Sequence, residues 1–431
     1  MRLTLLALAC VTQVAWGANL SAIYQLAHAN DAVLAAAQEA RKAGLEKLPQ
    51  GRALLLPTVN LNGNLNHNDN EYNLFPSQNY NSRSLALSLS QPIYRKQNLE
   101  SYEQAKLQVL QAEQTLKVAE QDLLLRVAKA YFDVLLAQDV LATARGQKQA
   151  YAEQLAQARK SFEVGAATIT DTHEAQARYD LTVAQEIAGL NDLEVKKRAL
   201  EKIVNQETPA LALLSEQAKV LLPEPNNMDA WVKQAEADSF AVALGRTAQE
   251  IARREVDKQK GGHHPTLDLA ASYADSRNQA SGVVTGINSK TGIIGLQFAL
   301  PIYQGGAIAS RVREASANLE KARFDLENAR RQATLDARQA YLGVISGSAQ
   351  VTALEQALVS SEAQLKSTKL GLEVGVRTRV DVLNAQQQLY STRKDLAAAR
   401  YQTLIAGLTL KTAAGSLSET DLKALDALLV E

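Results

Sequence analysis

The sequence predicts a mainly α-helical protein with a smaller β part, and three observations support this prediction. Long stretches of the chain contain no Pro and little Gly, four short segments alternate apolar and polar side chains, and much of the chain is repeated. The 431 residues include only nine Pro, six Phe, two Trp and one Cys. Such a composition favours long helices lined by small residues. The predicted fold class is therefore mainly α with β, built by an internal tandem duplication.

The repeat is clearest in FEVGAATITD at 162–171, which returns as LEVGVRTRVD at 372–381 (372 − 162 = 210). The same offset relates AYFDV at 130–134 to AYLGV at 340–344. A period this long is too large for a short solenoid repeat and indicates two copies of one subdomain. The copies meet near the proline-bearing stretch LPEPNN at 222–227.

The repeat divides the chain into three expected segments. Residues 1–17 form a signal peptide, 18–227 the first copy, and 228–431 the second copy with a further C-terminal segment. Each copy is expected to contain a helix, a β-hairpin and a long helical hairpin.

The first segment has one Arg, an apolar run and then small residues, which is typical of a secretory signal cleaved before Ala18. Cys10 lies inside this segment, so the mature chain is expected to have no cysteine. A lipoprotein signal with Cys10 as the acylated residue is the alternative interpretation.

Four segments alternate as strands do when one face is apolar and the other polar. Their apolar positions are Val59, Leu61, Gly63 and Leu65; Leu85, Leu87 and Leu89; Leu267, Leu269, Ala271 and Tyr273; and Ile294, Leu296, Phe298 and Leu300. Each segment has about the 10 residues that a tilted strand needs to cross outer-membrane hydrocarbon. Half-buried strands of a soluble sheet would show the same alternation. After the signal no stretch approaches 18 consecutive apolar residues, so any membrane crossing is expected to use strands.

Long helices are expected around these strands. From Arg95 to about Phe162 there is no Pro and a single Gly, which predicts a helical rod of about 100 Å. Ten of thirteen positions read every 3.5 residues from Leu99 to Leu141 are apolar, which predicts a coiled-coil seam. A second, weaker apolar stripe indicates packing on two sides. The second copy repeats this helix from about Gly306 to Leu370. Shorter helices are expected at 20–48, 171–205, 228–260 and 381–414.

Each long helix ends at a glycine that begins a turn into a returning helix. Gly165 and Gly375 suit the left-handed residue that ends a helix. The spacings Thr168-x-x-Asp171 and Thr378-x-x-Asp381 both predict a capping box at the start of the next helix. Helix capping alone would explain these Thr and Asp residues without any role in transport.

The charge balance and the motifs exclude several classes of function. The chain has 46 basic and 46 acidic residues, so no net field draws nucleic acid or an anionic substrate. The adjacent pair His263 and His264 has no Cys or third His nearby and predicts a turn rather than a metal site. There is no nucleophile elbow and no phosphate-binding loop, so we expect neither an enzyme nor a cofactor.

The strands lead to a prediction about assembly. Four strands cannot close on themselves, and hydrocarbon does not tolerate an open sheet edge. If the strands span a membrane, several chains must share one barrel, and since bacterial barrels start at eight strands the oligomer is at least a dimer. Helices attached to such a barrel would continue it as a tube. Each helix in the wall of a tube has a neighbour on either side, which agrees with the two apolar stripes of the long helix.

The chain resembles the TolC family of outer-membrane channel-tunnels along essentially its whole mature length. The resemblance lies in HPTLDL at 264–269, LPIYQGG at 300–306, FEVGAATITD at 162–171, EVGVRTRVDVLNAQQQLY at 373–390 and the tail at 410–429. It implies antiparallel coiled-coil hairpins that form an α-barrel, and a homotrimer whose twelve-stranded β-barrel takes four strands from each chain.

The resemblance also implies a location, a function and partners. The channel would lie in the outer membrane of a Gram-negative bacterium, with its helical part in the periplasm. It would be a passive, gated exit duct for type I protein secretion or multidrug efflux. Its partners would be a periplasmic adaptor protein, an inner-membrane ABC, RND or MFS transporter, and outer-membrane lipid, but no nucleic acid.

The functional residues that the resemblance implies lie at the helical turns. Thr170 and Asp171 match positions that bind the arginine matched by Arg377 and so hold the closed state. Leu372 replaces the family's tyrosine in this latch. Asp381 matches the first of two aspartates that ring the constriction and bind cations. The second aspartate is replaced by Asn384, so only a weak cation ring is expected.

Two other functions stay open from the sequence. Within the channel class, the chain could be the dedicated outlet of a single drug or metal pump. Outside that class, it could be a periplasmic coiled-coil scaffold without a pore. Two helical hairpins and isolated strand pairs in one chain favour the channel, because adaptors carry one hairpin flanked by small β domains.

Overall fold

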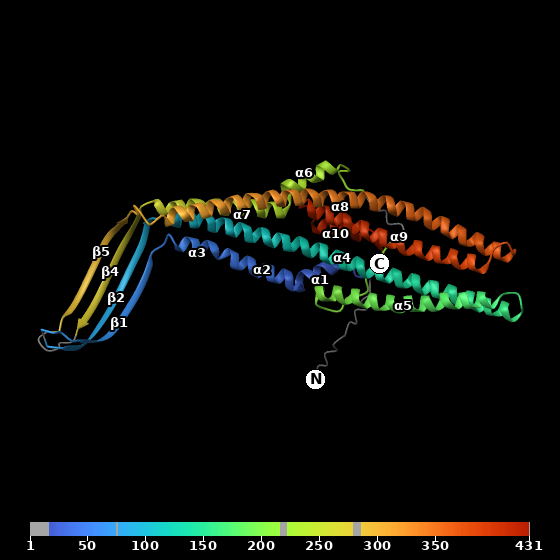
Figure 1. Ribbon diagram of the computed structural model, residues 1–431, viewed down its shortest axis with the longest axis horizontal. Helices are drawn as coiled ribbons and strands as arrows, with labels where there is room; N and C mark the ends of the chain where they lie inside the picture. Colours follow the sequence, from blue (N-terminus) through green and yellow to red (C-terminus); the bar gives the residue numbers. More distant parts are fainter. Residues whose placement is uncertain (1–16, 75, 216–221, 279–285, 431) are drawn as a thin grey trace, which may run out of the picture. The chain divides into compact units, whose positions relative to one another are not determined.

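The computed structural model describes residues 17–74, 76–215, 222–278 and 286–430. These residues form ten α-helices, one short 3-10 helix and six strands, labelled in Figure 1. They divide into two compact units. The sheet unit contains Gln38–Leu116 and Ala241–Ala329, and the helical unit contains the described residues up to Ala37, Lys117–Phe240 and Arg330 onward. Each unit draws on both halves of the chain, so the units do not coincide with the two predicted copies.

The sheet unit contains the four predicted strands. They are β1 (Thr58–Asn70), β2 (Gln78–Tyr94), β4 (Thr266–Asn278) and β5 (Asn288–Ala299). All neighbours are antiparallel in the order β1-β2-β4-β5, and the four ribbons lie side by side in Figure 1. The first two strands come from one copy and the last two from the other. Each predicted copy therefore contributes one antiparallel hairpin to the sheet.

The pairing register gives the sheet one apolar and one polar face. One row across the strands is Val59, Leu89, Ala271 and Ile294, and the next is Leu61, Leu87, Tyr273 and Gly292. Directly paired residues share a face, so these rows form a continuous apolar surface. Asn60, Ser88 and Ser272 pair on the opposite face, where Ile293 of β5 is the apolar exception in the row. Leu61 and Ile294 are 66% and 75% exposed in the single chain, which is unusual for side chains of this type in a contiguous patch.

The sheet is joined to helices at one end only. Strand β1 follows α3 (Lys47–Ala53), β2 leads into α4 (Lys96–Glu163), β4 follows α7 (Phe240–Lys260), and β5 leads into α8 (Ala307–Glu373). At this junction the guanidinium of Arg95 binds the carboxylate of Asp268 through two hydrogen bonds of 2.8 and 2.6 Å. Asp268 is buried, and a paired geometry of this kind offsets the cost of burying its charge.

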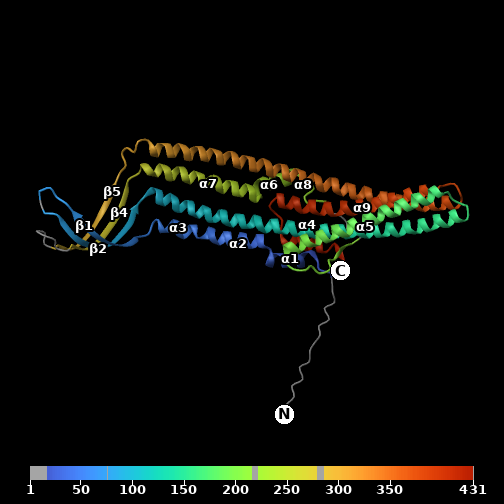
Figure 2. The same ribbon diagram turned by 60° about the horizontal axis from the view of Figure 1, so that its bottom comes forward.

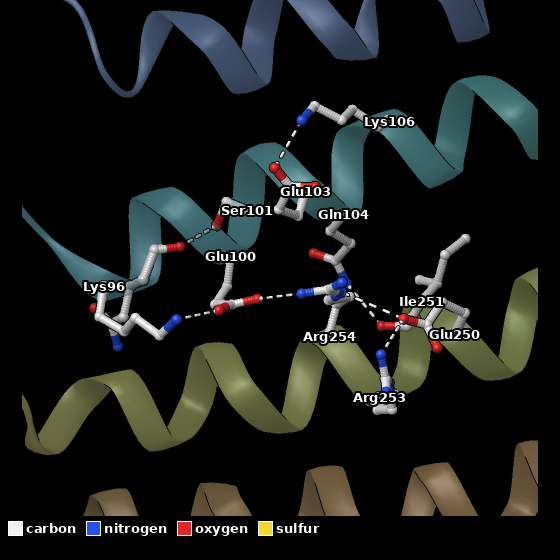
Figure 3. A network of polar contacts seen from close by, with 11 residues as sticks. Lys96, Glu100, Ser101, Glu103, Gln104, Lys106, Glu250, Ile251, Arg253 and Arg254 are labelled. Carbon is white, nitrogen blue, oxygen red and sulfur yellow. Dashed lines mark hydrogen bonds and ion pairs between the residues drawn. The ribbon is translucent and has the colours of Figure 1, made fainter.

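A second buried carboxylate joins α4 to α7 just beyond the junction, as Figure 3 shows. Glu100 accepts hydrogen bonds from Lys96 and, at 3.3 Å, from Arg254. The hydrogen bond from Lys96 lowers the pKa of Glu100, and Arg254 lowers it further. Arg254 also lies 3.3 Å from Glu250 on its own helix, and Gln104 donates to Glu255 at 3.1 Å. These contacts fix the start of α4, and with it the end of β2, against α7.

The helical unit contains the ends of both long helices and the helices that return from them. Its other elements are α1 (Leu20–Asn30), α5 (Ile169–Val204), β3 (Leu213–Leu214), α6 (Met228–Asp238), α9 (Arg379–Ala413), α10 (Glu419–Asp426) and β6 (Leu429–Val430). The α4–α5 and α8–α9 hairpins are visible in Figure 2. Antiparallel helices joined by short turns are what the repeated glycine turns predict.

Helix α4 packs on two sides at the centre of this unit, as its two apolar stripes predict. Leu123, Val127 and Val134 from the first stripe are buried, and so are Leu124 and Leu135 from the second. The seam is less buried near the start of the helix, where Leu99 is 42% exposed in the single chain. The long helix itself begins one residue later than predicted and ends one residue later, at Glu163.

Two shorter helices differ from the sequence prediction because each is interrupted. The helix expected at 20–48 breaks at Asp31, whose carboxylate caps α2 (Ala32–Leu45) by accepting from the Leu34 amide at 2.7 Å. The same carboxylate binds Arg126 through two contacts of 3.1 Å. The helix expected at 228–260 breaks at Ser239, where a ψ of 130° leaves the helical conformation and separates α6 from α7.

Two further predictions concern the signal peptide and the absence of a membrane-spanning helix. Residues 1–16 of the expected signal peptide, with Cys10, lie outside the described residues. Among the described residues no helix combines the length and apolar character needed to cross a membrane.

Candidate functional site: the two helical turns

The two turns of the helical unit have nearly the same backbone. Gly165 and Gly375 have φ of +74° and +80°, a conformation that L side chains rarely adopt. The amide of Ala166 donates to the Ser161 carbonyl at 2.8 Å, and that of Val376 donates to Gly371 at 2.9 Å. Each pattern is the Schellman arrangement that ends a helix at a left-handed glycine.

A capping box starts the helix after each turn, as the repeated spacing predicts. Asp171 accepts from the Thr168 amide at 3.0 Å, and the Asp171 amide donates to the Thr168 hydroxyl oxygen at 3.2 Å. Asp381 and Thr378 make the same pair of bonds at 2.9 and 3.2 Å. The hydrogen bonds from Thr168 and Thr378 lower the pKa of both carboxyls, so both are ionised at neutral pH.

The residues of the proposed constriction lie on one face of α9. Asp381 and Asn384 are three residues apart, so their side chains are neighbours on the helix surface. Asp381 is half-buried by its capping bonds, while Asn384 is exposed. The Asn384 side chain is held from the first hairpin, because Arg178 of α5 donates to Asn384 Oδ1 at 2.8 Å.

Arg178 links the two hairpins through more than one bond. Its guanidinium also donates to Gln387 Oε1 of α9 at 2.6 Å and to Glu174 of its own helix at 3.3 Å. Its Nε atom is buried and makes no protein hydrogen bond. A planar guanidinium that bonds two side chains of the opposite helix fixes their relative position more strictly than a lysine could.

A second arginine links the hairpins beside the turns. Arg379 donates to the Ser161 hydroxyl of α4 at 2.5 Å, and its positive charge contributes to lowering the pKa of Asp171. The family pattern instead assigns the latch to Arg377. Within one chain Arg377 is exposed and contributes to lowering the pKa of Asp381, not that of Asp171. Thr170 is exposed in the first turn of α5, and the Leu372 carbonyl accepts from Gly375.

Two tyrosines, the buried Tyr401 and the half-buried Tyr390, extend the links between α9 and α4. Tyr390 donates to the Gly146 carbonyl at 3.1 Å, and Tyr401 donates to Asp139 Oδ2 at 2.7 Å. Tyr401 also packs on Phe132, with ring centroids 5.8 Å apart. No pattern in the sequence predicts a role for Arg178, Tyr390 or Tyr401. The available signal for Arg178 is its place two helical turns beyond the capping aspartate Asp171, and its partner on another hairpin has no sequence signature.

Comparisons with known proteins place this chain in a family. The model of the family described as outer membrane efflux protein matches residues 23–206 and 231–416. The chain belongs to the outer membrane efflux protein family. The match falls in two segments, one in each half of the chain, as the tandem duplication predicts.

Individual relatives agree with the family match. The outer membrane protein TolC of Vibrio cholerae is 33% identical, over 98% of this chain and 96% of the relative. The alkaline protease secretion protein AprF of Pseudomonas aeruginosa is also 33% identical, over 93% of this chain and 85% of the relative. The solved structure of CusC superposes with a TM-score of 0.82 at 17% identity, covering 94% of this chain and 96% of that one.

These similarities confirm the predicted fold class and location. The chain has the two-repeat fold of the outer membrane efflux protein family, mainly helical with antiparallel strands. It is an outer-membrane protein and an exit duct of the kind that serves efflux and type I secretion. Among the described residues, which include His263 and His264, no group of three or more His, Cys, Asp or Glu could hold a metal ion.

Proposed function

We propose that three copies of this chain assemble into one outer-membrane channel whose barrel takes four strands from each copy. The open sheet carries the proposal. Within the described residues β1 pairs only with β2, and β5 only with β4, so each outer strand has an edge available to another chain. An open edge is not stable in hydrocarbon, whereas twelve strands from three copies close a barrel. The number three rests on the family resemblance, since two copies would also reach eight strands.

The two faces of the sheet support its orientation in such a barrel. The exposed apolar face, with Leu61 and Ile294, suits contact with lipid tails. The opposite face carries Asn60, Asn62 and Asn64 on β1 and Ser84 and Ser88 on β2. A polar face of small and amide side chains suits a water-filled lumen. All four strands join helices at the same end, so the helices would continue the duct on the periplasmic side.

The helical turns are proposed as the gate of this duct. Three-fold symmetry would bring three Asp381 carboxylates together around the axis. Arg377 of one copy is free to approach Thr170 and Asp171 of the next, which is the latch that the family pattern assigns. Leu372 would pack at this latch without the hydrogen bond of a tyrosine. Arg178 and Arg379 hold the two hairpins of one chain together, and their bonds would have to rearrange as the gate opens.

The cargo and the energy source are proposed to come from partner proteins. A duct without a nucleotide site depends on an inner-membrane transporter of the ABC, RND or MFS class and on a periplasmic adaptor. The similarity to a protease secretion protein over most of both chains supports type I secretion as one use. The efflux family match supports small-molecule export as another.

Single-channel recording tests the proposal directly. The protein, extracted from the outer-membrane fraction as a stable oligomer, is added to planar bilayers, and divalent cations are added from each side in turn. We expect discrete cation-selective openings that divalent cations block from the side of the helical turns. Folded oligomers that never conduct would support the scaffold instead and would refute the channel. Mass measurement of the oligomer in detergent separates three copies from two.

A further inference from the structure

The apolar face of the sheet ends in a cluster of positive charge near the strand turns. Arg83 on β2 pairs directly with Arg277 on β4, and Lys290 on β5 pairs with Asp275. Asp275 and Arg277 are two residues apart on one strand, so all four side chains belong to the same face. Leu65 of β1 pairs with Arg83 and places the cluster directly beside the apolar rows.

The cluster carries more positive charge than its own contacts neutralise. Arg277 binds the Asp275 carboxylate through two hydrogen bonds of 3.2 Å. Arg83 and Lys290 also interact electrostatically with Asp275, so three cations share one carboxylate. Arg83, Arg277 and Lys290 are exposed. The next carboxylate on this face in the described strands is Asp69, four residues beyond Leu65 along β1.

The position of the cluster along the strands matches the edge of a membrane. Phe298, Leu296 and Ile294 lead along the apolar face of β5 to Lys290, eight residues from Phe298. Eight residues of strand span about 26 Å, or about 20 Å along the membrane normal at a tilt of about 40°. The apolar band of an outer-membrane barrel is about 25 Å tall. The cations therefore lie where hydrocarbon gives way to headgroups.

At this depth the cations are placed to bind an anionic partner from outside the chain. Arginine and lysine on a lipid-facing surface cost about 0 to 1 kcal/mol near the interface, and several times more at the midplane. Guanidinium groups bind phosphate oxygens with two parallel hydrogen bonds, and a basic group near an anionic surface gains from each phosphate. Phosphate groups attached to lipid tails match a cationic cluster that adjoins an apolar face.

We propose that Arg83, Arg277 and Lys290 form a binding site for the phosphate groups of the phosphorylated glycolipid in the outer leaflet. Each copy in the assembly would carry one site on its lipid-facing surface. The inference rests on the proposed function, because it places the apolar face in lipid and the strand turns outside the cell. The lipid tails would lie against Leu65, Leu85 and Ile294 while the phosphates contact the cations.

The test compares the complete oligomer with a variant in which the three cations become Gln. Arg83→Gln, Arg277→Gln and Lys290→Gln are combined, and thermal unfolding in detergent is measured against purified lipopolysaccharide and against the same lipid after enzymatic dephosphorylation. We expect lipopolysaccharide to stabilise the unmodified protein, the dephosphorylated lipid to have little effect, and the variant to bind lipopolysaccharide about a hundredfold more weakly. Equal stabilisation of the two proteins, or by the two lipids, would overturn the proposal.

Matched controls separate the site from general charge. Lys42→Gln, Lys321→Gln and Arg323→Gln remove three exposed cations from helices of the same unit, and this variant should keep the response to lipopolysaccharide. Arg83→Lys with Arg277→Lys keeps the charge and should retain most of the binding. If the Gln variant does not fold, the two lipids still test the unmodified protein. In bilayers of phosphatidylcholine alone, all variants should conduct like the unmodified protein. If no protein conducts there, including the unmodified one, the result would contradict the channel and not the lipid site.

Discussion

Arg178 of α5 donates a hydrogen bond to Oδ1 of Asn384 on α9 at 2.8 Å, and this bond joins the first hairpin of the chain to the second. Asn384 occupies the position where the family pattern has the second aspartate of the cation ring. Its amide oxygen is instead used to hold the two hairpins together. The side chain of Asn384 therefore helps to hold the two hairpins of one chain together.

The first prediction is that Arg178→Ala loosens the gate. Removing the guanidinium deletes the bonds to Asn384 and Gln387, and two exposed hydrogen bonds at about 0.5 to 1 kcal/mol each together contribute about 1 to 2 kcal/mol. We expect a roughly 5- to 30-fold larger open population, measured as open probability in single-channel records. Arg198→Ala is the control, because Arg198 pairs only with Glu194 and Glu201 of its own helix among the contacts described. Equal gating in the two variants would show that the hairpin link does not hold the gate.

The second prediction separates the cation ring from helix capping. Asp381→Ala and Asp171→Ala each remove one capping box and should each cost about 1 kcal/mol of stability. Only Asp381→Ala is expected to abolish block by divalent cations nearly completely. With three carboxylates, block of the unmodified channel should be weaker than in relatives with six. Unchanged block in Asp381→Ala would remove this residue from the gate.

The pH dependence of this block follows from the lowered pKa of Asp381. Hydrogen bonds from Thr378 favour the ionised carboxylate, so its pKa lies below the ordinary value of 3.8. The carboxylate therefore stays charged through the range from about pH 5 to 8, and block should be constant there. The capping contribution to stability is likewise present above the unfolded pKa and is lost as the pH falls through the folded one. Block that weakens between pH 7 and 5 would contradict this assignment.

The third prediction concerns the close approach of α8 to α9. A Cβ atom at Gly347 would lie 2.4 Å from Thr403 Oγ1 and 3.1 Å from its Cγ2. Thr403 is buried, β-branched and bonded to the Ala399 carbonyl at 2.6 Å, so it has little freedom to move. Gly347→Ala should therefore destabilise the protein by about 1 to 3 kcal/mol.

A second glycine of the same helix is the control for this substitution. At Gly343 the added Cβ would meet only the Ala406 methyl at 3.7 Å, an ordinary contact. Gly343→Ala should be neutral or stabilising by up to about 1 kcal/mol, because alanine favours the helix. Thermal unfolding of both variants at one concentration and scan rate measures the difference. Equal stability of the two would show that α8 and α9 can separate at Thr403.

The large elements of the fold follow from the sequence because their signals are local. The alternation at Val59 to Leu65 predicts β1, and the absence of Pro between Arg95 and Phe162 predicts α4. The breaks at Asp31 and Ser239 do not follow, because at each break some of the contacts come from residues far along the chain. Asp31 leaves the helical conformation where Arg126, 95 residues away in the chain, binds its carboxylate. At Ser239 the preceding carbonyl lies close to Gly415, far along the chain.

In the candidate site, too, the contacts between residues close in sequence could be predicted, and those between distant residues could not. Thr168 and Asp171, or Thr378 and Asp381, are three residues apart, so their spacing alone predicts the capping boxes. The bonds from Arg178 to Asn384 and from Arg379 to Ser161 join residues about 210 positions apart. No periodicity fixes which residues of two hairpins face each other. The family pattern assigns Arg377 to the latch. Within one chain, however, it is the charge of Arg379 that contributes to lowering the pKa of Asp171.

The last prediction uses the partly buried contact between Tyr401 and Asp139. Burial raises the pKa of the Asp139 carboxyl, against the hydrogen bond from Tyr401 and the charge of Arg400, which both lower it. The folded pKa therefore lies above the unfolded one, and between the two the native state binds more protons. Stability contributed by this group consequently falls as the pH rises through that window, and the ionised carboxylate is unfavourable at neutral pH.

Asp139→Asn should remove this unfavourable charge while keeping an oxygen that accepts from Tyr401. We expect the variant to melt about 2 °C higher than the unmodified protein at pH 7. The difference should vanish at about pH 3, where the native carboxyl is already protonated and neutral. Tyr401→Phe is the contrasting variant, because it leaves the carboxylate without its donor and should lower the melting temperature at pH 7. A difference between Asp139→Asn and the unmodified protein that does not change with pH would mean that packing, and not the charge of Asp139, determines stability at this contact.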